Sequence, residues 1–277
     1  MAVASEAARA AIEDGACIVL PTDTVYGIGA DAFSAEAVQR LLDAKQRGRD
    51  MPPPVLIGDA SLIRALATDV PESAKELVAK HWPGPLTIIC KIQPSLRMDL
   101  GDAEGTIALR VPDHDVAREV LRRTGPMAVS SANLSGQPAA LTCDDAIAQL
   151  GDRVAVYLDA GTLGGATGAP STIVDFTQHD VGEVLRLGAL SLEVLRETLP
   201  DVLDLPQAGD DASAASDDES SSDETSPDES CPDDPEEGES WDAMASAGTD
   251  SDYTGDVDPD QPDLFETVED DRKTAGS

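Results

Sequence analysis

Two short runs of the sequence place hydroxyl side chains and glycine directly after an apolar segment. The run TDTVYGIG occupies residues 22–29 and follows an apolar segment at 17–20, and the run SSANLSG occupies residues 130–136 and follows an apolar segment at 127–129. Hydroxyl and amide groups at the end of a strand can hydrogen-bond a small polar ligand, and glycine allows the backbone to approach that ligand closely. An ordinary turn between a strand and a helix uses the same residue types, so both interpretations stay open at this point.

Basic residues occur where an anionic ligand would need them. Lys45 and Arg47 lie at the end of a predicted helix over 34–45, and Arg110 lies within the apolar segment 106–112. Lysine offers a point charge and arginine a planar fork, and both suit phosphate oxygens, although cations at the end of a helix can simply complement its dipole. Burial of Arg110 requires an anionic partner, which is either a protein carboxylate or a ligand phosphate.

Apolar runs alternate with helical segments through residues 1–199. Strands are predicted at 17–20, 55–57, 86–92, 106–112, 127–130 and 154–158, with a closing hairpin formed by 171–176 and 183–188. Because some neighbouring strands have no helix between them, the pattern favours an α/β fold with a twisted sheet of mixed direction. Ser34 and Asp113 are expected to cap helices over 34–45 and 113–123, and Thr142 with Asp145 has the spacing of a capping box.

The acidic residues are unevenly distributed, which predicts two parts. The chain has 277 residues and a formal net charge of −35, and residues 206–277 hold 25 Asp and Glu against two Lys and Arg. This segment is rich in Ser, Asp, Glu, Gly and Pro and has no clustered apolar residues, so burial cannot offset its chain entropy. We therefore predict one folded domain over 1–205 and a disordered acidic tail over 206–277.

Composition also indicates the surroundings of the protein. The chain has five lysines against 14 arginines, and an acidic, lysine-poor domain is typical of a halophilic cytoplasm, where near-molar ions reduce the Debye length to roughly 3 Å. A mesophile with an acidic partner-binding tail is the alternative. The four cysteines have no metal-binding spacing, and neither a signal peptide nor a membrane span is recognisable. These features predict a soluble cytoplasmic protein with no membrane contact.

Seven motifs occur in one order along residues 5–199. They are PTDTVYGIGADA at 21–32, the K-x-R of Lys45 and Arg47, WPGPLT at 82–87, ALRVP at 108–112, SSANLSG at 130–136, STIVD at 171–175 and LRLG at 185–188. In this order the motifs resemble the YrdC-like family, the threonylcarbamoyl-AMP (threonylcarbamoyladenylate) synthases. The resemblance implies a twisted open α/β sheet with a concave, basic cavity. It also implies a nucleotidyltransferase that converts L-threonine, bicarbonate and ATP to threonylcarbamoyl-AMP and pyrophosphate.

The resemblance also implies roles for particular residues. Lys45, Arg47, Ser131 and Asn133 would form the ATP site, with Lys45 and Arg47 also catalytic. The side chains expected to complete the ATP site are those of Arg110, Ser171 and Arg186, and the side chains expected to contact threonine are those of Thr22, Thr24 and Tyr26. Mg²⁺ is expected to arrive with the nucleotide, because no dedicated set of metal ligands is visible in the sequence.

The segment after the K-x-R motif reads GRDMPPPVLI and departs from the family pattern. We expect residues 48–54 to form a mobile lid that excludes water from a labile carbamate. The departure leaves the role of Arg49 open. Some family members carry a second globular domain where this chain has its acidic tail, so the resemblance assigns the tail no function.

Partners and rival functions follow from the same resemblance. The implied downstream partner is a threonylcarbamoyl transferase complex of the KEOPS type, which acts on tRNA, and a direct tRNA contact is a further expectation. An RNA-binding paralogue without threonine chemistry is the main alternative. Residues 1–205 hold 17 Lys and Arg against 29 Asp and Glu, which argues against strong phosphate-driven RNA binding. A carbamoyl transferase that uses this domain would carry additional domains and zinc-finger cysteines.

Overall fold

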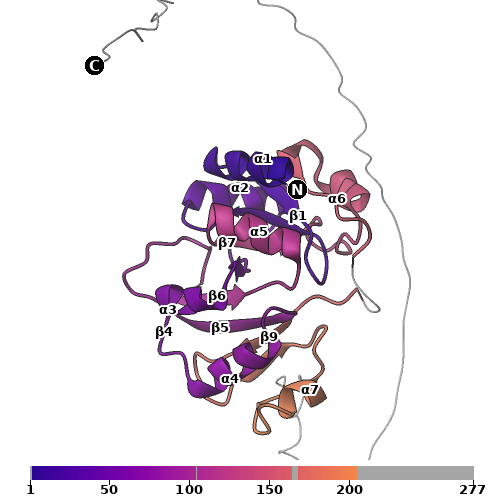
Figure 1. Cartoon of the computed structure of the whole chain (residues 1–277). Helices are drawn as coiled ribbons and strands as arrows, with labels where there is room; N and C mark the ends of the chain where they lie inside the picture. The colour runs from indigo at the N-terminus through magenta and orange to yellow at the C-terminus, as the bar shows by residue number, and fades with distance from the viewer. Residues whose placement is uncertain (1, 104, 164–167, 205–277) are drawn as a thin grey trace, which may run out of the picture. The chain divides into compact units, whose positions relative to one another are not determined.

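The structure is a computed structural model that describes residues 2–103, 105–163 and 168–204 (Figure 1). The predicted tail over 206–277 lies outside the described residues, so its disorder and the domain boundary at 205 stay predictions. No helix of the described residues is long and apolar enough to cross a membrane.

One sheet of ten strands runs through the described residues. In order across the sheet, the strands are β10 (Glu183–Arg186), β9 (Thr172–Asp175), β5 (Leu86–Ile92), β6 (Thr106–Arg110), β3 (Val55–Leu56), β7 (Met127–Ser131), β2 (Gly27–Asp31), β1 (Ile18–Leu20) and β8 (Val156–Tyr157), and β4 (Ala67–Thr68) pairs with β5 outside this order. Strands β1 and β8, β3 and β6, and β5 and β9 pair in parallel, and the other neighbours are antiparallel. The predicted α/β fold with a mixed sheet is confirmed, and so is the closing hairpin, formed by β9 and β10.

Helices cover the two faces of the sheet unequally. The helices are α1 (Ala2–Glu13), α2 (Ala35–Lys45), α3 (Ile63–Leu66), α4 (Glu72–His81), α5 (Asp115–Thr124), α6 (Cys143–Leu150) and α7 (Leu192–Arg196), with single 3₁₀ turns η1 (Ala60–Leu62) and η2 (Gly151–Arg153). Helices α2, α4, α6 and α7 contribute to the larger apolar core on one face. Helices α1 and α5 lie against each other on the opposite face, over β1, β3 and β7 (Figure 1).

The register of the strands shows which residues share the face under α1 and α5. Leu56 of β3 packs beneath these helices, and it lies opposite Arg110 of β6. Ala108 of β6 lies opposite Ile89 of β5 in the next pair. Because side chains alternate between the two faces of a sheet, Arg110, Ala108 and Ile89 share the face of Leu56. The core beneath α1 and α5 contains no described residue of β5, β6 or β9. The part of this face formed by β5, β6 and β9 is therefore not covered by these two helices.

Two of the three predicted helix caps are confirmed. Ser34 accepts a hydrogen bond from the backbone N–H of Ala37, and Thr142 forms the expected capping box at the start of α6. The prediction for Asp113 is wrong, because α5 begins at Asp115 and its N-cap position is His114, which makes no capping bond. The Asp113 carboxylate instead accepts from Nη1 of Arg118 at 3.0 Å, and this ion pair competes with the capping geometry.

The run at 22–29 differs from the turn expected there. Its second half belongs to β2, which pairs antiparallel with both β1 and β7. A Cβ atom on Gly27 would lie 2.6 Å from the side chain of Val129, and one on Gly29 would lie 2.6 Å from that of Met127. These glycines therefore admit side chains of β7, and Gly27 also lines the cavity described below, so its close approach to a ligand stays a prediction.

Candidate functional site

A cavity of about 230 Å³ lies over the part of the sheet that α1 and α5 leave uncovered. Its walls come from β3, β5, β6, β7, β9 and β10, from Arg47, and from loops around 22–27, 52–54 and 100–106. The charged side chains among its described lining residues are Arg47, Arg110 and Arg186, and none is Asp or Glu. The expected concave, basic cavity is confirmed, although the domain as a whole has an excess of acidic residues.

The three arginines are close enough to influence one another. Burial lowers the pKa of Arg186, and the positive charges of Arg110 and Arg47 lower it further. Burial likewise lowers the pKa of Arg47. Like charges held together in a partly desolvated cavity repel each other, and a bound anion relieves that repulsion. The cavity is therefore suited to a ligand with several negative charges.

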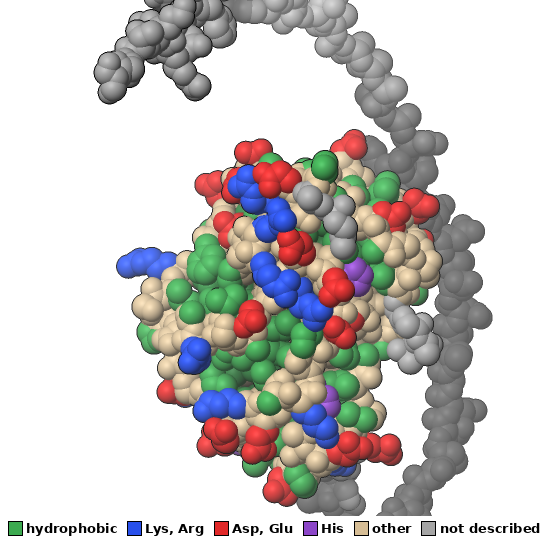
Figure 2. Space-filling model, in the orientation of Figure 1, with side chains coloured by type: hydrophobic (Ala, Val, Ile, Leu, Met, Phe, Trp, Pro, Cys, Tyr) green, Lys and Arg blue, Asp and Glu red, His purple; other side chains and the backbone are tan. Residues whose placement is uncertain are grey.

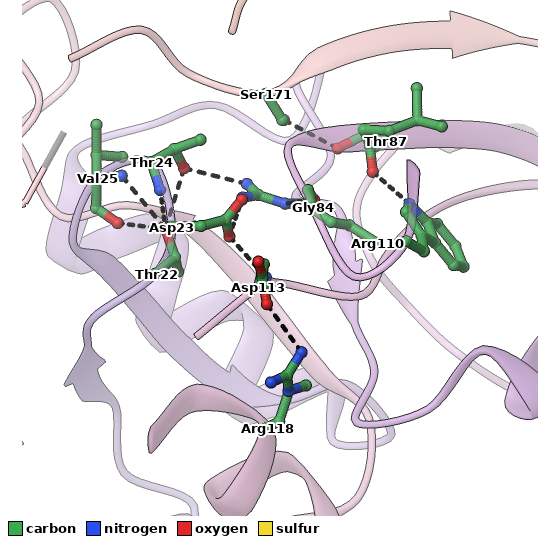
Figure 3. A network of polar contacts seen from close by, with 12 residues as sticks. Thr22, Asp23, Thr24, Val25, Gly84, Thr87, Arg110, Asp113, Arg118 and Ser171 are labelled. Carbon is green, nitrogen blue, oxygen red and sulfur yellow. Dashed lines mark hydrogen bonds and ion pairs between the residues drawn. The ribbon is translucent and has the colours of Figure 1, made fainter. Parts of the chain in front are cut away.

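Arg110 is held by protein groups on several sides (Figure 3). Its Nη2 donates to Oδ1 of Asp23 at 2.6 Å, its Nη1 to Oγ1 of Thr24 at 3.2 Å and its Nε to the carbonyl of Gly84 at 3.0 Å. The open choice between a protein carboxylate and a ligand phosphate is thus settled for this contact in favour of the carboxylate. The second oxygen of Asp23, Oδ2, is buried without a partner among the described residues.

Arg47 retains a free donor at the cavity wall. Its Nη1 donates to Oγ of Ser130 at 2.9 Å, whereas its Nε is buried and has no partner among the described residues. A buried donor without an acceptor costs free energy. Nη2 of Arg47 makes no hydrogen bond among the described residues and is not fully buried, so Nη2 is the donor that an anion in the cavity can reach.

Arg186 extends from β10 to the start of β9. Its Nη2 donates to the carbonyl of Ser171 at 2.9 Å and to Oγ of Ser171 at 3.3 Å, and its Nε donates to the same carbonyl at 3.2 Å. The Oγ of Ser171 also lies 2.9 Å from Oγ1 of Thr87, a fully buried side chain of β5 (Figure 3). Ser171 and Arg186 are therefore fixed against each other at one edge of the cavity.

Lys45 and Asn133 lie behind the cavity wall. Lys45 is 2% exposed, and its Nζ donates to the carbonyls of Ser131 and Asn133 and to Oδ1 of Asn133. The amide of Asn133 donates to the carbonyls of Leu134 and Gln137, at 2.8 and 2.7 Å. Neither residue is among those that line the cavity. The Lys45 side chain thus does not extend into solvent from the end of α2, and its ammonium holds the loop after β7 in place.

The hydroxyls expected to contact threonine are occupied by protein groups. Thr22 donates to the carbonyl of Val25 at 2.6 Å, so the bond between Oγ1 of Thr22 and Oγ1 of Thr24, at 3.0 Å, uses the proton of Thr24. The hydroxyl of Tyr26 donates to the carbonyl of Gly161 at 2.8 Å. These three side chains line the cavity, but their hydroxyl protons stabilise the turn and the segment at 159–161.

The structure brings eight of the ten predicted site residues to the cavity wall and leaves Lys45 and Asn133 one layer behind it. It adds three residues that the sequence reasoning did not select: Asp23, which pairs with Arg110, Ser130, which pairs with Arg47, and Thr87, which pairs with Ser171. Each belongs to a motif already noticed, namely PTDT, SSAN and WPGPLT. The motifs therefore carried a signal, but the spacing alone did not show which side chain faces the cavity.

Residues 48–54, the expected lid, contact a second loop around 97–103. The backbone N–H of Asp102 donates to the carbonyl of Arg49 at 2.9 Å, and Nη2 of Arg49 pairs with Asp99. Pro53 and the buried Leu100 both line the cavity. The part of the cavity wall that contains the expected lid therefore includes two loops, 48–54 and 97–103, which Arg49 joins.

In the described part of the chain, no three His, Cys, Asp or Glu side chains lie together as a metal site would require. The donors at the cavity are guanidinium and hydroxyl groups, which suit an anion and not a bare cation.

The fold and the cavity define an α/β protein with a basic cavity over one face of its mixed sheet. Residues 10–188 match the family model Sua5_yciO_yrdC, described as "Telomere recombination". The chain belongs to this Sua5/YciO/YrdC family, as the motif order predicts.

Similar proteins carry consistent names. A Mycobacterium leprae protein named "Putative threonylcarbamoyl-AMP synthase" is 53% identical over 69% of this chain and 86% of its own length. The threonylcarbamoyl-AMP synthase of Bacillus subtilis is 35% identical over 69% of this chain and 55% of its own length.

Solved structures show the same fold. P. abyssi Sua5 complexed with L-threonine superimposes with a TM-score of 0.68 at 30% identity, over 73% of this chain and 58% of the Sua5 chain. E. coli YciO matches with a TM-score of 0.62 at 24% identity, over 70% of this chain and 93% of its own, and this likeness concerns the fold alone.

Proposed function

We propose that this protein is a threonylcarbamoyl-AMP synthase, a nucleotidyltransferase that acts on L-threonine, bicarbonate and ATP. The observation that carries the proposal is a cavity whose described lining holds three arginines and no acidic side chain. All three substrates carry negative charge: a triphosphate, a carboxylate and bicarbonate itself. The names of the similar proteins support this function over the RNA-binding alternative.

The reaction has two steps in this proposal. The amine of threonine bonds to the carbon of bicarbonate and water leaves, which forms a carbamate. A carbamate oxygen then bonds to the α-phosphorus of ATP, and the bond to pyrophosphate breaks. No side chain of the cavity needs to become covalently attached, so positioning and charge neutralisation supply the catalysis.

Particular residues have distinct roles in these steps. Arg47, through Nη2, and Arg186 neutralise charge on the triphosphate. Ser131 adds a hydroxyl at the wall, and Lys45 positions Ser131 through its backbone carbonyl. Arg110, already paired with Asp23, acts as an oriented donor with reduced net charge. Mg²⁺ enters bound to ATP and belongs to the substrate.

The product defines the next protein in the sequence of reactions. A mixed anhydride of a carbamate and AMP is labile in water, so a transferase must accept the threonylcarbamoyl group promptly. We propose a tRNA-modifying transferase complex of the KEOPS type as that partner, with a direct tRNA contact by this chain. The proposed location is the cytoplasm, with a high internal salt concentration matching the acidic, lysine-poor composition.

The deciding experiment is detection of threonylcarbamoyl-AMP by mass spectrometry. The full chain is incubated with L-threonine, bicarbonate, Mg²⁺ and ATP, and each substrate is omitted in turn. We expect the product only in the complete mixture, with pyrophosphate in equal amount. RNA binding by the chain without any product in the complete mixture would contradict the proposal and favour the RNA-binding paralogue.

A further inference from the structure

Asp23 supports Arg110 from behind the cavity wall. Its Oδ1 accepts from Nη2 of Arg110 at 2.6 Å and from the backbone N–H of Asp113 at 3.0 Å (Figure 3). Its other oxygen, Oδ2, is buried and has no hydrogen-bond partner among the described residues. Because each carboxylate oxygen can accept hydrogen bonds, half of the capacity of Asp23 is unused.

His114 carries a second buried atom without a partner in the same region. It follows Asp113 directly in the chain, and its Nδ1 makes no hydrogen bond to the described residues. Burial lowers the pKa of His114 from its ordinary value of 6.5. The largest opposing influence is the charge of Asp23, which raises that pKa more than Asp113 or Asp115 does, and Arg118 is the remaining charge that acts on the ring. Asp23 therefore acts on the imidazole at short range.

The two unpartnered atoms have complementary chemistry. Oδ2 of Asp23 can only accept, whereas a histidine nitrogen either accepts or donates, depending on where the ring carries its proton. A neutral ring brings no charge to Asp23, so the carboxylate stays paired with Arg110 alone. When the ring takes up a second proton, both of its nitrogens donate, and the unused oxygen of Asp23 is a buried acceptor for one of them. The negative charge of Asp23 is then shared between His114 and Arg110.

We propose that His114 tunes the charge of Arg110 through Asp23, so that an anionic group of the substrate binds at Arg110 more tightly when His114 is protonated. The pair of Asp23 and Arg110 has no net charge, and a proton on His114 gives the cluster one positive charge. His114 and Asp23 are not among the described residues that line the cavity, whereas Arg110 is. His114 is therefore a positioning residue that acts through Asp23 and Arg110.

Arg110 keeps donors for such a ligand. Its guanidinium has five N–H groups, and three of them donate to Asp23, Thr24 and Gly84. Two N–H groups therefore remain for an anionic oxygen in the cavity. Whether that oxygen belongs to the carboxylate of threonine or to a phosphate of ATP rests on the proposed function, whereas the coupling to His114 rests on the contacts and charges alone.

The coupling is reciprocal. If protonation of His114 favours binding of the anion, then the bound anion favours protonation of His114 by the same factor. We expect about a 3- to 10-fold difference in affinity between the two protonation states, because the added charge acts through a partly desolvated site. The pKa of His114 should then rise by about 0.5 to 1 when the ligand is bound.

NMR titration of the histidine ring protons in the full chain measures this pKa. The chain has three histidines, so His81→Asn and His179→Asn identify the signal of His114 by elimination. The titration covers about pH 5 to 7.5 without ligand, with saturating L-threonine and with saturating sulfate, because the charge of each ligand is nearly constant over this range. We expect the pKa of His114 to rise with one ligand. A rise with L-threonine places a carboxylate at Arg110, and a rise with sulfate places a phosphate there.

Calorimetry with the same ligand supplies the matched comparison. The original chain should bind it about 3- to 10-fold more tightly at the acidic end of the range than at the neutral end. His114→Asn cannot titrate and should lose this dependence on pH. The control is His81→Asn, which removes a histidine outside the cavity lining whose pKa burial also lowers, and this variant should behave like the original chain.

Two results would overturn the inference. One is a pKa of His114 that neither ligand changes, and the other is a dependence on pH that persists in His114→Asn. If His114→Asn does not fold, the NMR titration of the original chain still decides. Both measurements are separate from failure of the proposed function, because neither requires product. A chain that makes no threonylcarbamoyl-AMP but shows the ligand-dependent pKa would keep the coupling and lose only the synthase assignment.

Discussion

Arg47 reaches the cavity with its Nη2 group, which makes no hydrogen bond among the described residues. We predict that Arg47→Ala removes about 2–4 kcal/mol of transition-state stabilisation, or roughly 30- to 1000-fold in rate. Stability should change little, because the side chain makes a single hydrogen bond, to Ser130. Product formation and thermal unfolding are both measured, with Arg64→Ala, at an exposed residue outside the cavity lining, as the control. Normal turnover by Arg47→Ala would remove Arg47 from the site.

Lys45 is expected to affect the stability of the fold, because its side chain is buried behind the cavity wall. Burial and the charge of Arg47 lower the pKa of Lys45 from 10.5 to about 8 in the folded state. Between pH 8 and 10.5 the unfolded chain therefore binds more protons than the folded chain, so stability rises with pH through this window. The full change corresponds to roughly 3 kcal/mol.

The measurement compares Lys45 with a side chain that does not titrate. Lys45→Met should be less stable than the original chain at pH 7, because the carbonyls of Ser131 and Asn133 lose their donor. We predict that this deficit grows as the pH is raised from 8 toward 10.5, by chemical denaturation at each pH. A constant difference across that range would show that Lys45 keeps its ordinary pKa.

At the scale of elements, the loops at 48–54 and 97–103 are joined mainly by Arg49. Its side chain pairs with Asp99, and a Cβ on Gly101, where φ is +104°, would lie 2.6 Å from the carbonyl oxygen of Arg49. The close packing of these loops explains why a segment with three consecutive prolines is held at the cavity. The departure from the family pattern at GRDMPPPVLI thus gives Arg49 a role in positioning the wall.

We predict that Arg49→Ala loosens this wall without unfolding the protein. The ion pair with Asp99 is exposed on both sides, so its loss should cost no more than about 1 kcal/mol of stability. The KM values should rise severalfold while amide hydrogen exchange at 97–103 becomes faster. Lys75→Ala, which removes a comparable exposed ion pair within α4, serves as the control. Unchanged exchange at 97–103 would show that Arg49 does not hold the loops together.

At the scale of the molecule, many charged side chains on the surface of the described residues are paired with opposite charges, whereas two arginines of the cavity are not. On the face shown in Figure 2, basic side chains lie beside acidic ones. The described residues form ion pairs such as Arg9 with Glu6 and Arg123 with Glu119. The arginines of the cavity differ, because Arg47 and Arg186 have no ion-pair partner among the described residues. Positive potential is thus concentrated where an anionic substrate would bind.

The acidic tail is expected to contribute little to folding or catalysis. Residues 206–277 hold 25 acidic side chains and only isolated aromatic residues. We predict that a chain ending at Pro206 melts within a few degrees of the full chain and keeps its synthase activity, since the tail offers almost no apolar surface to bury. Melting and product formation are compared in the same salt concentration. Loss of activity on truncation would place part of the catalytic unit beyond residue 206.

The sequence by itself determined the fold class and the family, and it selected eight residues that line the cavity. Short apolar runs predicted strands of the mixed sheet, and seven ordered motifs indicated the family that the comparison confirmed. Local patterns reach this far because alternation, capping and turn chemistry depend on near neighbours in the chain. The same patterns misplaced the cap at Asp113, whose carboxylate instead pairs with Arg118, five residues further along the chain.

Tertiary structure decided which polar groups remain available to a ligand. The sequence could not show that Lys45 is buried against the loop after β7, or that the protons of Thr22 and Thr24 are used within the turn. Nor could it show that Thr87 lies beside Ser171, because the two are 84 residues apart and meet only through the pairing of β5 with β9. Hydrogen-bond capacity is settled by three-dimensional neighbours, so the free donors of the cavity emerge only when distant strands are brought together.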